Sequence, residues 1–77
     1  MLDKVKTIIG DYVAVEVSKI NAESKLIEDL GMNSYEFMSL VGQIEDEFDI
    51  EVDEREVVKI KTVGEIIEYI QSLQLVN

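Results

Sequence analysis

Three stretches of this chain place apolar residues along one face of an α-helix. Within each stretch these residues recur at positions i, i+3, i+4 and i+7, the spacing of a helical face that packs on a core. The stripes are Val5, Ile8, Ile9, Tyr12 and Val13, then Phe37, Leu40, Val41, Ile44 and Phe48, and finally Val63, Ile66, Ile67, Ile70 and Leu73. No pair of alternating segments is joined by a hairpin turn, so the pattern predicts an all-α fold.

Three residue pairs have the spacing of capping boxes and indicate where helices begin. These pairs are Asn33 with Glu36, Asp53 with Glu56, and Thr62 with Glu65. We expect a first helix at about residues 2–16, a second that starts at Ser34, a short third at about Glu54–Ile60 and a fourth after Thr62. In the short helix Val57, Val58 and Ile60 are expected to face the core. The sequence therefore predicts a small four-helix bundle, with three longer helices and a short third one, in a single domain over residues 1–77.

A long loop, VSKINAESKLIEDLGM, joins the first two predicted helices. It spans residues 17–32, and we expect four apolar side chains to anchor it to the core: Ile20, Leu26, Ile27 and Leu30. Gly31 supplies backbone freedom just before the predicted cap. Loops of this length are usually functional or carry local structure of their own. Because the expected core is rich in Val and Ile, whose helices depend on packing, it could open between helices to admit an apolar guest.

Composition excludes several kinds of chemistry. The chain has no Cys and no His, so disulfides, thiol catalysis and transition-metal sites of the usual kind are not expected, and a reducing cytoplasm fits. The longest apolar runs are only a few residues, too short for a membrane span. The net charge is −10, and most of it lies between Asn33 and Glu56, where nine acids face Arg55 alone. Such a surface repels nucleic acid and attracts basic protein partners, although solubility alone also explains acidic residues.

Ser34 is the most informative polar residue. As the first residue of its helix it would present an exposed hydroxyl at the positive end of the helix dipole. Nothing in the chain could take its proton, so the sequence excludes a Ser-His-Asp type of nucleophile. Two alternatives stay open at this point: a serine that merely suits a first helical turn, and a point of covalent attachment modified by another enzyme. The second role needs a rigid mount and N–H groups that tolerate a phosphodiester.

The acidic run EDEFDIEVDERE resembles a calcium loop only superficially. Asp49, Glu51 and Asp53 fall at the first, third and fifth positions of an EF-hand loop. Its sixth position should be Gly and is Glu54, and its twelfth should be Glu and is Ile60. Because the bend and the bidentate ligand are both missing, we predict no EF-hand. We expect no dedicated metal site, although weak binding of a divalent cation between the clustered carboxylates stays open.

The outer face of the second predicted helix carries Tyr35, Met38 and Gly42, away from the core stripe. An exposed Tyr and Met beside an acidic surface suit protein docking, since Met adapts to varied partners. The alternative is that one or both tuck against the long loop.

Together these features resemble the acyl carrier protein family over nearly the whole chain. The stretch IEDLGMNS, residues 27–34, is similar to the family's E-D-L-G-x-D-S attachment motif. The stretch IEDEFDIEVDEREVVKIKTVGEIIEYI, residues 44–70, is similar to the end of its second helix, its third helix and its fourth helix. The family usually has Asp before the serine, Leu after it and Asp next, where this chain has Asn33, Tyr35 and Glu36.

The resemblance implies that a phosphopantetheinyl transferase attaches 4′-phosphopantetheine from coenzyme A to Ser34. The chain would then be no enzyme but a carrier of acyl groups, held as thioesters on the arm, in fatty-acid, polyketide or related biosynthesis. The family docks its loading and processing enzymes, which have basic patches, through its second and third helices. The matching positions here are Tyr35, Glu36, Met38, Glu45, Asp46 and Glu54. We expect a cytoplasmic monomer. Two other functions stay open: a peptidyl or aminoacyl carrier, and an acidic helical interaction module that is never modified.

Overall fold

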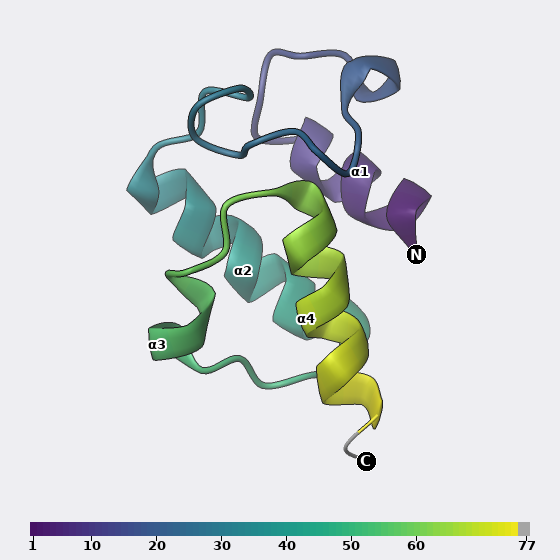
Figure 1. Cartoon of the computed structure of the whole chain (residues 1–77), viewed down its shortest axis with the longest axis vertical. Coiled ribbons are helices and arrows are strands. Elements are labelled where there is room, and N and C mark those ends of the chain that lie inside the picture. The colour runs from purple at the N-terminus through teal and green to yellow at the C-terminus, as the bar shows by residue number, and fades with distance from the viewer. Residues whose placement is uncertain (76–77) are drawn as a thin grey trace.

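The computed structural model describes residues 1–75. Within that range the chain forms four α-helices and one 3-10 helix, and its only strand-like pairing is an isolated antiparallel bridge between Lys25 and Thr62 (Figure 1). The elements are α1 (Leu2–Gly10), the 3-10 helix Val17–Lys19, α2 (Ser34–Phe48), α3 (Glu54–Val57) and α4 (Val63–Leu75). The predicted all-α fold, with three longer helices, a short third one and a long loop after the first, is confirmed.

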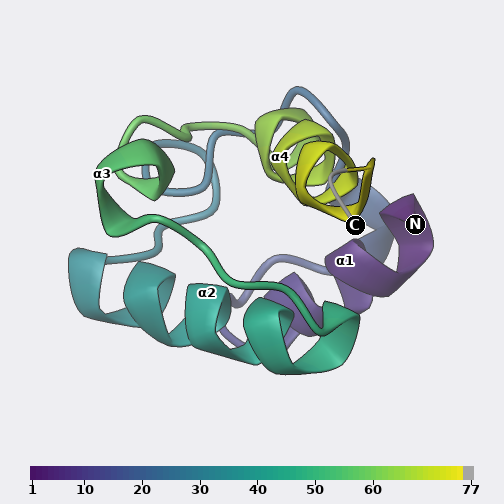
Figure 2. The same ribbon diagram turned by 90° about the horizontal axis from the view of Figure 1, so that it is seen from below.

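The core draws side chains from every part of the chain. Figure 2 shows α2 along one side of the molecule with α3 and α4 across from it, and α1 packs against both α2 and α4. The buried apolar residues of the helical stripes are Val5, Ile8 and Ile9 of α1, Phe37, Leu40, Val41 and Ile44 of α2, and Val63, Ile66 and Ile70 of α4. Burial of such a side chain contributes about 1.5–3 kcal/mol. The β-branched helices depend on this packing, because their intrinsic helix propensity is modest.

The first helix is shorter than predicted, since α1 ends at Gly10 rather than near residue 16. The hydrogen bonds at its end span three residues instead of four. The N–H of Asp11 donates to the Ile8 carbonyl at 3.1 Å, and the N–H of Tyr12 donates to the Ile9 carbonyl at 2.9 Å. The next valines, Val13, Val15 and Val17, recur every second residue, a period that suits extended backbone better than a helix. The chain also folds back here, because a Cβ on Gly10 would lie only 2.7 Å from a methyl group of Val17.

The long loop is fastened to the start of α4 by main-chain hydrogen bonds. The N–H of Leu26 donates to the Lys61 carbonyl at 2.8 Å. The N–H of Val63 donates to the Ser24 carbonyl at 3.1 Å, and the N–H of Gly64 donates to the Ala22 carbonyl at 2.8 Å. A Cβ on Gly64 would lie 3.0 Å from the Ala22 carbonyl oxygen, so this close approach favours glycine. We refer to these three bonds as the loop tether.

The predicted loop anchors are correct for three of four side chains. Ile20, Leu26 and Leu30 are buried, whereas Ile27 is 54% exposed and the prediction for it is wrong. Met32, which the sequence did not single out, is buried in its place. Residues 25–30 form a hydrogen-bonded turn, with the N–H groups of both Asp29 and Leu30 donating to the Lys25 carbonyl. In that turn Leu26 faces the core, and its neighbour Ile27 therefore faces outward.

The third helix is also shorter than predicted, covering Glu54–Val57 rather than Glu54–Ile60. Val57 is buried and Ile60 is partly buried, as expected, but Val58 is 66% exposed, so its predicted core position is wrong. A helix of one turn can direct only one narrow face inward, and Val57 occupies that face. None of the helices in residues 1–75 has the length and apolar content to cross a bilayer.

Two of the three predicted capping boxes form. The side chain of Asn33 accepts from the N–H of Glu36, and the Glu36 carboxylate accepts from the N–H of Asn33. At α4 the Thr62 hydroxyl accepts from the Glu65 N–H at 3.2 Å, and Glu65 accepts from the Thr62 N–H at 3.0 Å. The N–H groups of Lys61 and Thr62 donate to the Glu65 carboxylate and hold its pKa below the ordinary value.

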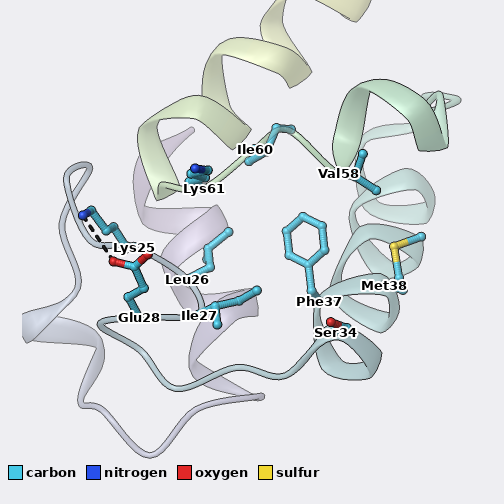
Figure 3. Close-up of a pocket in the computed structure, with 10 residues that line it drawn as sticks. All are labelled: Lys25, Leu26, Ile27, Glu28, Ser34, Phe37, Met38, Val58, Ile60 and Lys61. Atoms are coloured by element: carbon cyan, nitrogen blue, oxygen red, sulfur yellow. Dashed lines mark hydrogen bonds and ion pairs between the residues drawn. The ribbon is translucent and has the colours of Figure 1, made fainter.

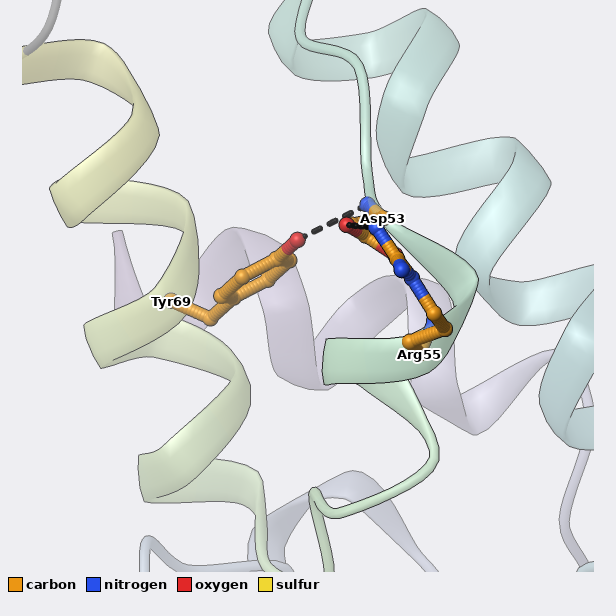
Figure 4. A network of polar contacts seen from close by, with 3 residues as sticks. All are labelled: Asp53, Arg55 and Tyr69. Atoms are coloured by element: carbon orange, nitrogen blue, oxygen red, sulfur yellow. Dashed lines mark hydrogen bonds and ion pairs between the residues drawn. The ribbon is translucent and has the colours of Figure 1, made fainter.

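The capping box at α3 is replaced by a contact with α4. The Asp53 carboxylate caps the helix by accepting from the Arg55 N–H at 2.8 Å, but the N–H of Asp53 donates to the Tyr69 hydroxyl at 2.9 Å instead of to Glu56 (Figure 4). The Arg55 side chain and then its N–H lower the pKa of Asp53. The box predicted at Asp53 and Glu56 is therefore wrong, because a hydroxyl brought by the tertiary fold takes the N–H that Glu56 would have bound.

Tyr69→Phe is expected to loosen α3 by removing the acceptor for the Asp53 N–H. We expect a loss of about 0.5–1.5 kcal/mol in the free energy of unfolding, measured by urea denaturation. We also expect faster hydrogen exchange at the Asp53 amide. The matched control is Tyr35→Phe, because the Tyr35 side chain is 81% exposed. Unchanged exchange at Asp53 in Tyr69→Phe would contradict the role given to this hydroxyl.

Candidate functional site

Ser34 is the first residue of α2 and is exposed, as predicted. The residue before it, Asn33, has extended backbone (φ −97°, ψ 173°) and is the N-cap of the helix. Its Oδ1 accepts from the Glu36 N–H at 2.7 Å, and Glu36 Oε1 accepts from the Asn33 N–H at 3.1 Å. These reciprocal bonds fix both backbone groups that flank the serine. The hydroxyl of Ser34 is therefore held at a defined place while it stays open to solvent.

The backbone that leads to Ser34 is also held in place. Gly31 has a φ of +76°, a left-handed conformation that glycine adopts without strain. The N–H of Gly31 donates to the Ile27 carbonyl and that of Met32 to the Leu26 carbonyl, each at 3.1 Å. Met32, 2% exposed, packs its side chain into the core. The position of Ser34 is thus fixed from both sides, by the capping box of Asn33 and Glu36 and by the anchored turn that precedes Asn33.

The surroundings of Ser34 suit attachment and not nucleophilic catalysis by this chain. In residues 1–75 the Ser34 hydroxyl has no protein hydrogen-bond partner, and the nearest carboxylate in the helix, that of Glu36, is taken up by the cap. The N–H groups of Ser34 and Tyr35 belong to the first turn, where no helical carbonyl is available to them. They leave a site at a helix N-terminus that favours the oxygen atoms of an anionic group.

A pocket opens beside Ser34 and has a volume of about 340 Å³. Its walls come from three parts of the chain, namely the loop, the first turns of α2 and the segment that follows α3 (Figure 3). The lining residues are Lys25, Leu26, Ile27, Glu28, Ser34, Phe37, Met38, Val58, Ile60 and Lys61. Apolar side chains dominate the centre, and the exposed Ile27 and Val58 are both part of it. The two residues that the sequence wrongly assigned to the core thus belong to the pocket beside the serine.

The sequence indicated only that the core could open between helices for an apolar guest and did not predict the residues that line this pocket, although it offered one signal. Ile27 and Val58 are apolar and lie outside the three helical stripes. Apolar residues without a place in a periodic stripe are candidates for a binding wall as well as for a core. Only the loop tether, which joins residues far apart in the sequence, brings Ile27 and Val58 to the same cavity.

The residues predicted for docking fall into two groups. Tyr35 (81% exposed), Met38, Asp46 and Glu54 have exposed side chains and are available to a partner. The other two carboxylates already bond main-chain N–H groups, Glu36 in the α2 cap and Glu45 at 3.1 Å from the Val52 nitrogen. Gly42 is half-buried, and a Cβ there would meet nothing within 4 Å. Met38 also lines the pocket, so this outer face of α2 is continuous with it.

The acidic segment does not assemble into a metal site. In the part of the chain that the structure describes, no group of three or more carboxylates is arranged to hold a metal ion. Asp49 instead ends α2 in a left-handed conformation (φ 53°), which Asp tolerates better than most residues, and Asp53 caps α3.

Comparison with known proteins places the chain among carriers. Residues 3–70 match the family described as "Phosphopantetheine attachment site". The acyl carrier protein of Thermotoga maritima is 42% identical over 71 residues, which are 92% of this chain and 88% of that protein. That of Clostridium acetobutylicum is 38% identical over 72 residues, 94% of each chain. A solved structure of the acyl carrier protein from Enterococcus faecalis has a TM-score of 0.81 at 33% identity, covering 94% of this chain and 91% of that one.

Asn33→Ala is expected to destabilise the site, because the Glu36 N–H loses its acceptor. We expect a loss of about 1 kcal/mol in the free energy of unfolding, hence a melting temperature lower by roughly 4–8 °C. Asn33→Asp, which keeps an acceptor at the cap, is the matched control and should retain the stability. The measurement is thermal unfolding followed by circular dichroism, with hydrogen exchange at the Glu36 amide. Equal stability of the Ala and Asp variants would show that the cap does not fix Ser34.

Proposed function

Because this chain belongs to the phosphopantetheine-attachment family of acyl carrier proteins, we propose that Ser34 is its attachment residue for 4′-phosphopantetheine. The observation that carries this proposal is the exposed hydroxyl at the first position of α2, held by the reciprocal bonds of Asn33 and Glu36 and open to the pocket. Members of the family are carriers and not enzymes. The chain accordingly supplies a mount for the cofactor, and other proteins supply the catalysis.

The residues around Ser34 fit a phosphodiester. The Ser34 Oγ is the atom to which the phosphorus would bond, and the first-turn N–H groups of Ser34 and Tyr35 can donate to the phosphate oxygens. Asn33 caps the helix without adding a charge, and the carboxylate of Glu36, two residues after Ser34, is turned to the Asn33 N–H. The neutral cap keeps repulsion of the phosphodiester low.

Attachment replaces one bond to phosphorus with another. The Ser34 oxygen bonds to the phosphorus that carries the pantetheine, the pyrophosphate bond of coenzyme A breaks, and the adenosine bisphosphate leaves. The chain has no His, and its Glu36 carboxylate is bound in the cap, so neither can accept the serine proton. The transferase must therefore supply the base that takes this proton. When bound, the cofactor supplies the thiol that this Cys-free chain lacks, and the thiol carries the acyl group as a thioester.

The pocket suits the apolar part of the cargo. Leu26, Ile27, Phe37, Val58 and Ile60 contribute apolar surface to it, and Ser34 stands at its edge (Figure 3). We propose that the acyl chain attached through Ser34 enters this pocket between α2 and the segment after α3. Each methylene group that leaves water there contributes about 0.8 kcal/mol. Shelter of this kind keeps a reactive cargo from water between visits to enzymes.

The partners that we propose are a phosphopantetheinyl transferase and acyl-loading and acyl-processing enzymes with basic docking patches. The exposed residues Tyr35, Met38, Asp46 and Glu54 offer two apolar and two acidic contacts, of which Tyr35 directly follows Ser34 and Met38 lines the pocket beside it. Charges at the rim of such an interface raise association rates more than affinity. This suits a carrier, because it must also dissociate from each enzyme. We further propose a monomer in the cytoplasm, where the thiol of the arm stays reduced.

Ser34→Ala is expected to abolish modification. The protein is incubated with coenzyme A and a broad-specificity phosphopantetheinyl transferase, and the intact mass is recorded. The unaltered chain should gain one phosphopantetheine group, whereas Ser34→Ala should gain none. Ser18→Ala, at another exposed serine, is the matched control and should be modified in full.

The same measurement separates the alternatives. A gain of mass in Ser34→Ala would place the attachment elsewhere, and no gain by the unaltered chain with several transferases would favour the unmodified acidic module. A peptidyl or aminoacyl carrier would be modified in the same way, and the loading enzyme that then accepts the protein identifies the cargo.

Asp46→Lys is expected to weaken recognition by the transferase without affecting the fold. Reversal of this exposed charge should raise the KM about three- to tenfold at low ionic strength. The effect should shrink in high salt, because the charges of an exposed rim are screened. Asp11→Lys is the matched control, since Asp11 is exposed after the end of α1 and outside the docking surface. An equal rise in KM for both variants would indicate an effect of net charge alone.

A further inference from the structure

The rim of the pocket farthest from Ser34 has a charge opposite to that of the rest of the molecule. The chain carries 17 acids and 7 basic residues, yet the pocket is lined by two lysines, Lys25 and Lys61, and by one acid, Glu28. In Figure 3 these three side chains lie on one side of the pocket, Ser34, Met38 and Val58 lie on the other, and Leu26 and Phe37 stand between. An apolar passage therefore leads from the attachment residue to a basic rim.

Of the two lysines, Lys61 is the one available to a ligand. Lys25 Nζ already lies 3.3 Å from Glu28 Oε2 in an exposed ion pair. Among the described residues no carboxylate lies within ion-pair distance of Lys61 Nζ, and the nearby carboxylate of Glu65 accepts from the main-chain N–H groups of Lys61 and Thr62. The Glu65 carboxylate attracts the Lys61 ammonium, but the two groups form no ion pair in the part of the chain that the structure describes, so this ammonium can also reach a ligand.

The backbone of Lys61 is nevertheless fixed. Its carbonyl accepts from the Leu26 N–H in the loop tether, at 2.8 Å, and its N–H donates to Glu65 at 3.0 Å. The stem of the side chain therefore starts from a defined point on the rim, and its four methylene groups let the ammonium follow a ligand.

Resting on the proposed attachment at Ser34, we propose that this pocket selects acyl cargo whose far end carries a carboxylate, which Lys61 binds at the rim. At about 30 Å³ for each water-sized group, a volume of about 340 Å³ holds on the order of ten such groups. The arm is flexible and can turn back beside Ser34, so a short chain on its thiol can enter the pocket there and extend past Leu26 and Phe37 toward Lys61. The apolar walls cover its methylene groups, and the exposed rim lets the carboxylate pair with the ammonium while it keeps part of its hydration, so little desolvation opposes the contact.

The test compares three forms of the protein: with the unloaded arm, with a hexanoyl group and with an adipoyl group. The two acyl groups have the same chain length and differ by the terminal carboxylate. Each form is made by transfer from the corresponding coenzyme A derivative and checked by intact mass. Failure of all three transfers would refute the attachment proposal itself, whereas the results below concern only the choice of cargo.

Lys61→Gln is expected to lower the melting temperature of the adipoyl form by roughly 2–4 °C more than that of the other two forms. This excess should fall in high salt. Lys59→Gln is the matched control, because it removes the same charge from an exposed neighbour that does not line the pocket. Methyl resonances of Leu26 and Ile60 should shift in both acylated forms, which reports that the chain lies in the pocket.

Three results would overturn the proposal. Equal losses for the hexanoyl and adipoyl forms of Lys61→Gln would mean that the carboxylate makes no contact with this lysine. A similar loss in the form with the unloaded arm would assign Lys61 to the phosphodiester instead of the cargo. Methyl resonances that do not move in either acylated form would place the chain outside the pocket.

Discussion

The site depends on the loop tether, the three main-chain hydrogen bonds that hold residues 22–26 against residues 61–64. The connection between α1 and α2, residues 11–33, would otherwise have many conformations, and ordering it has an entropic cost that side-chain contacts alone offset poorly. The tether supplies directional bonds at a place where Leu26 is also buried. It thereby puts one wall of the pocket next to the segment after α3, and it delivers the chain to Gly31 and Asn33 in the right direction for α2 to begin at Ser34.

Features that rest on neighbouring residues could be predicted from the sequence. The core stripes of α2 and α4, the cap of α2 by Asn33 and Glu36, and the exposed position of Ser34 depend on contacts three or four residues apart, and they were found. Features that join distant segments could not be predicted. The sequence predicts Ile27 and Val58 in the core because apolar residues usually pack inside, whereas the tether brings both to a shared cavity. Glu56 was given a bond that the Tyr69 hydroxyl, 16 positions from Asp53, makes instead.

The part of the pocket formed by α2 is rigid, whereas the segment after α3 can adjust. On the α2 side the serine is fixed by paired bonds to the backbone on either side of it, which suits a residue that other enzymes must find. The segment after α3, by contrast, carries exposed side chains, among them Val58 and Lys61, which can adjust to what the pocket contains. In the functions that we propose, the exposed residues of α2 serve recognition by proteins and the basic rim serves recognition of the cargo.

The single turn of α3 has a consequence for how such a domain can diversify. The helix is held by the Asp53 cap and by the Tyr69 hydroxyl of α4, and the residues after it line the pocket. None of these bonds involves Ser34 or the residues that cap α2. Substitutions in residues 58–60 can therefore resize the cavity while Ser34, its cap and the proposed docking residues stay the same. One scaffold could in this way pass from one pathway to another by changes in a single short segment, and the same segment is where a designer seeking a new cargo would begin.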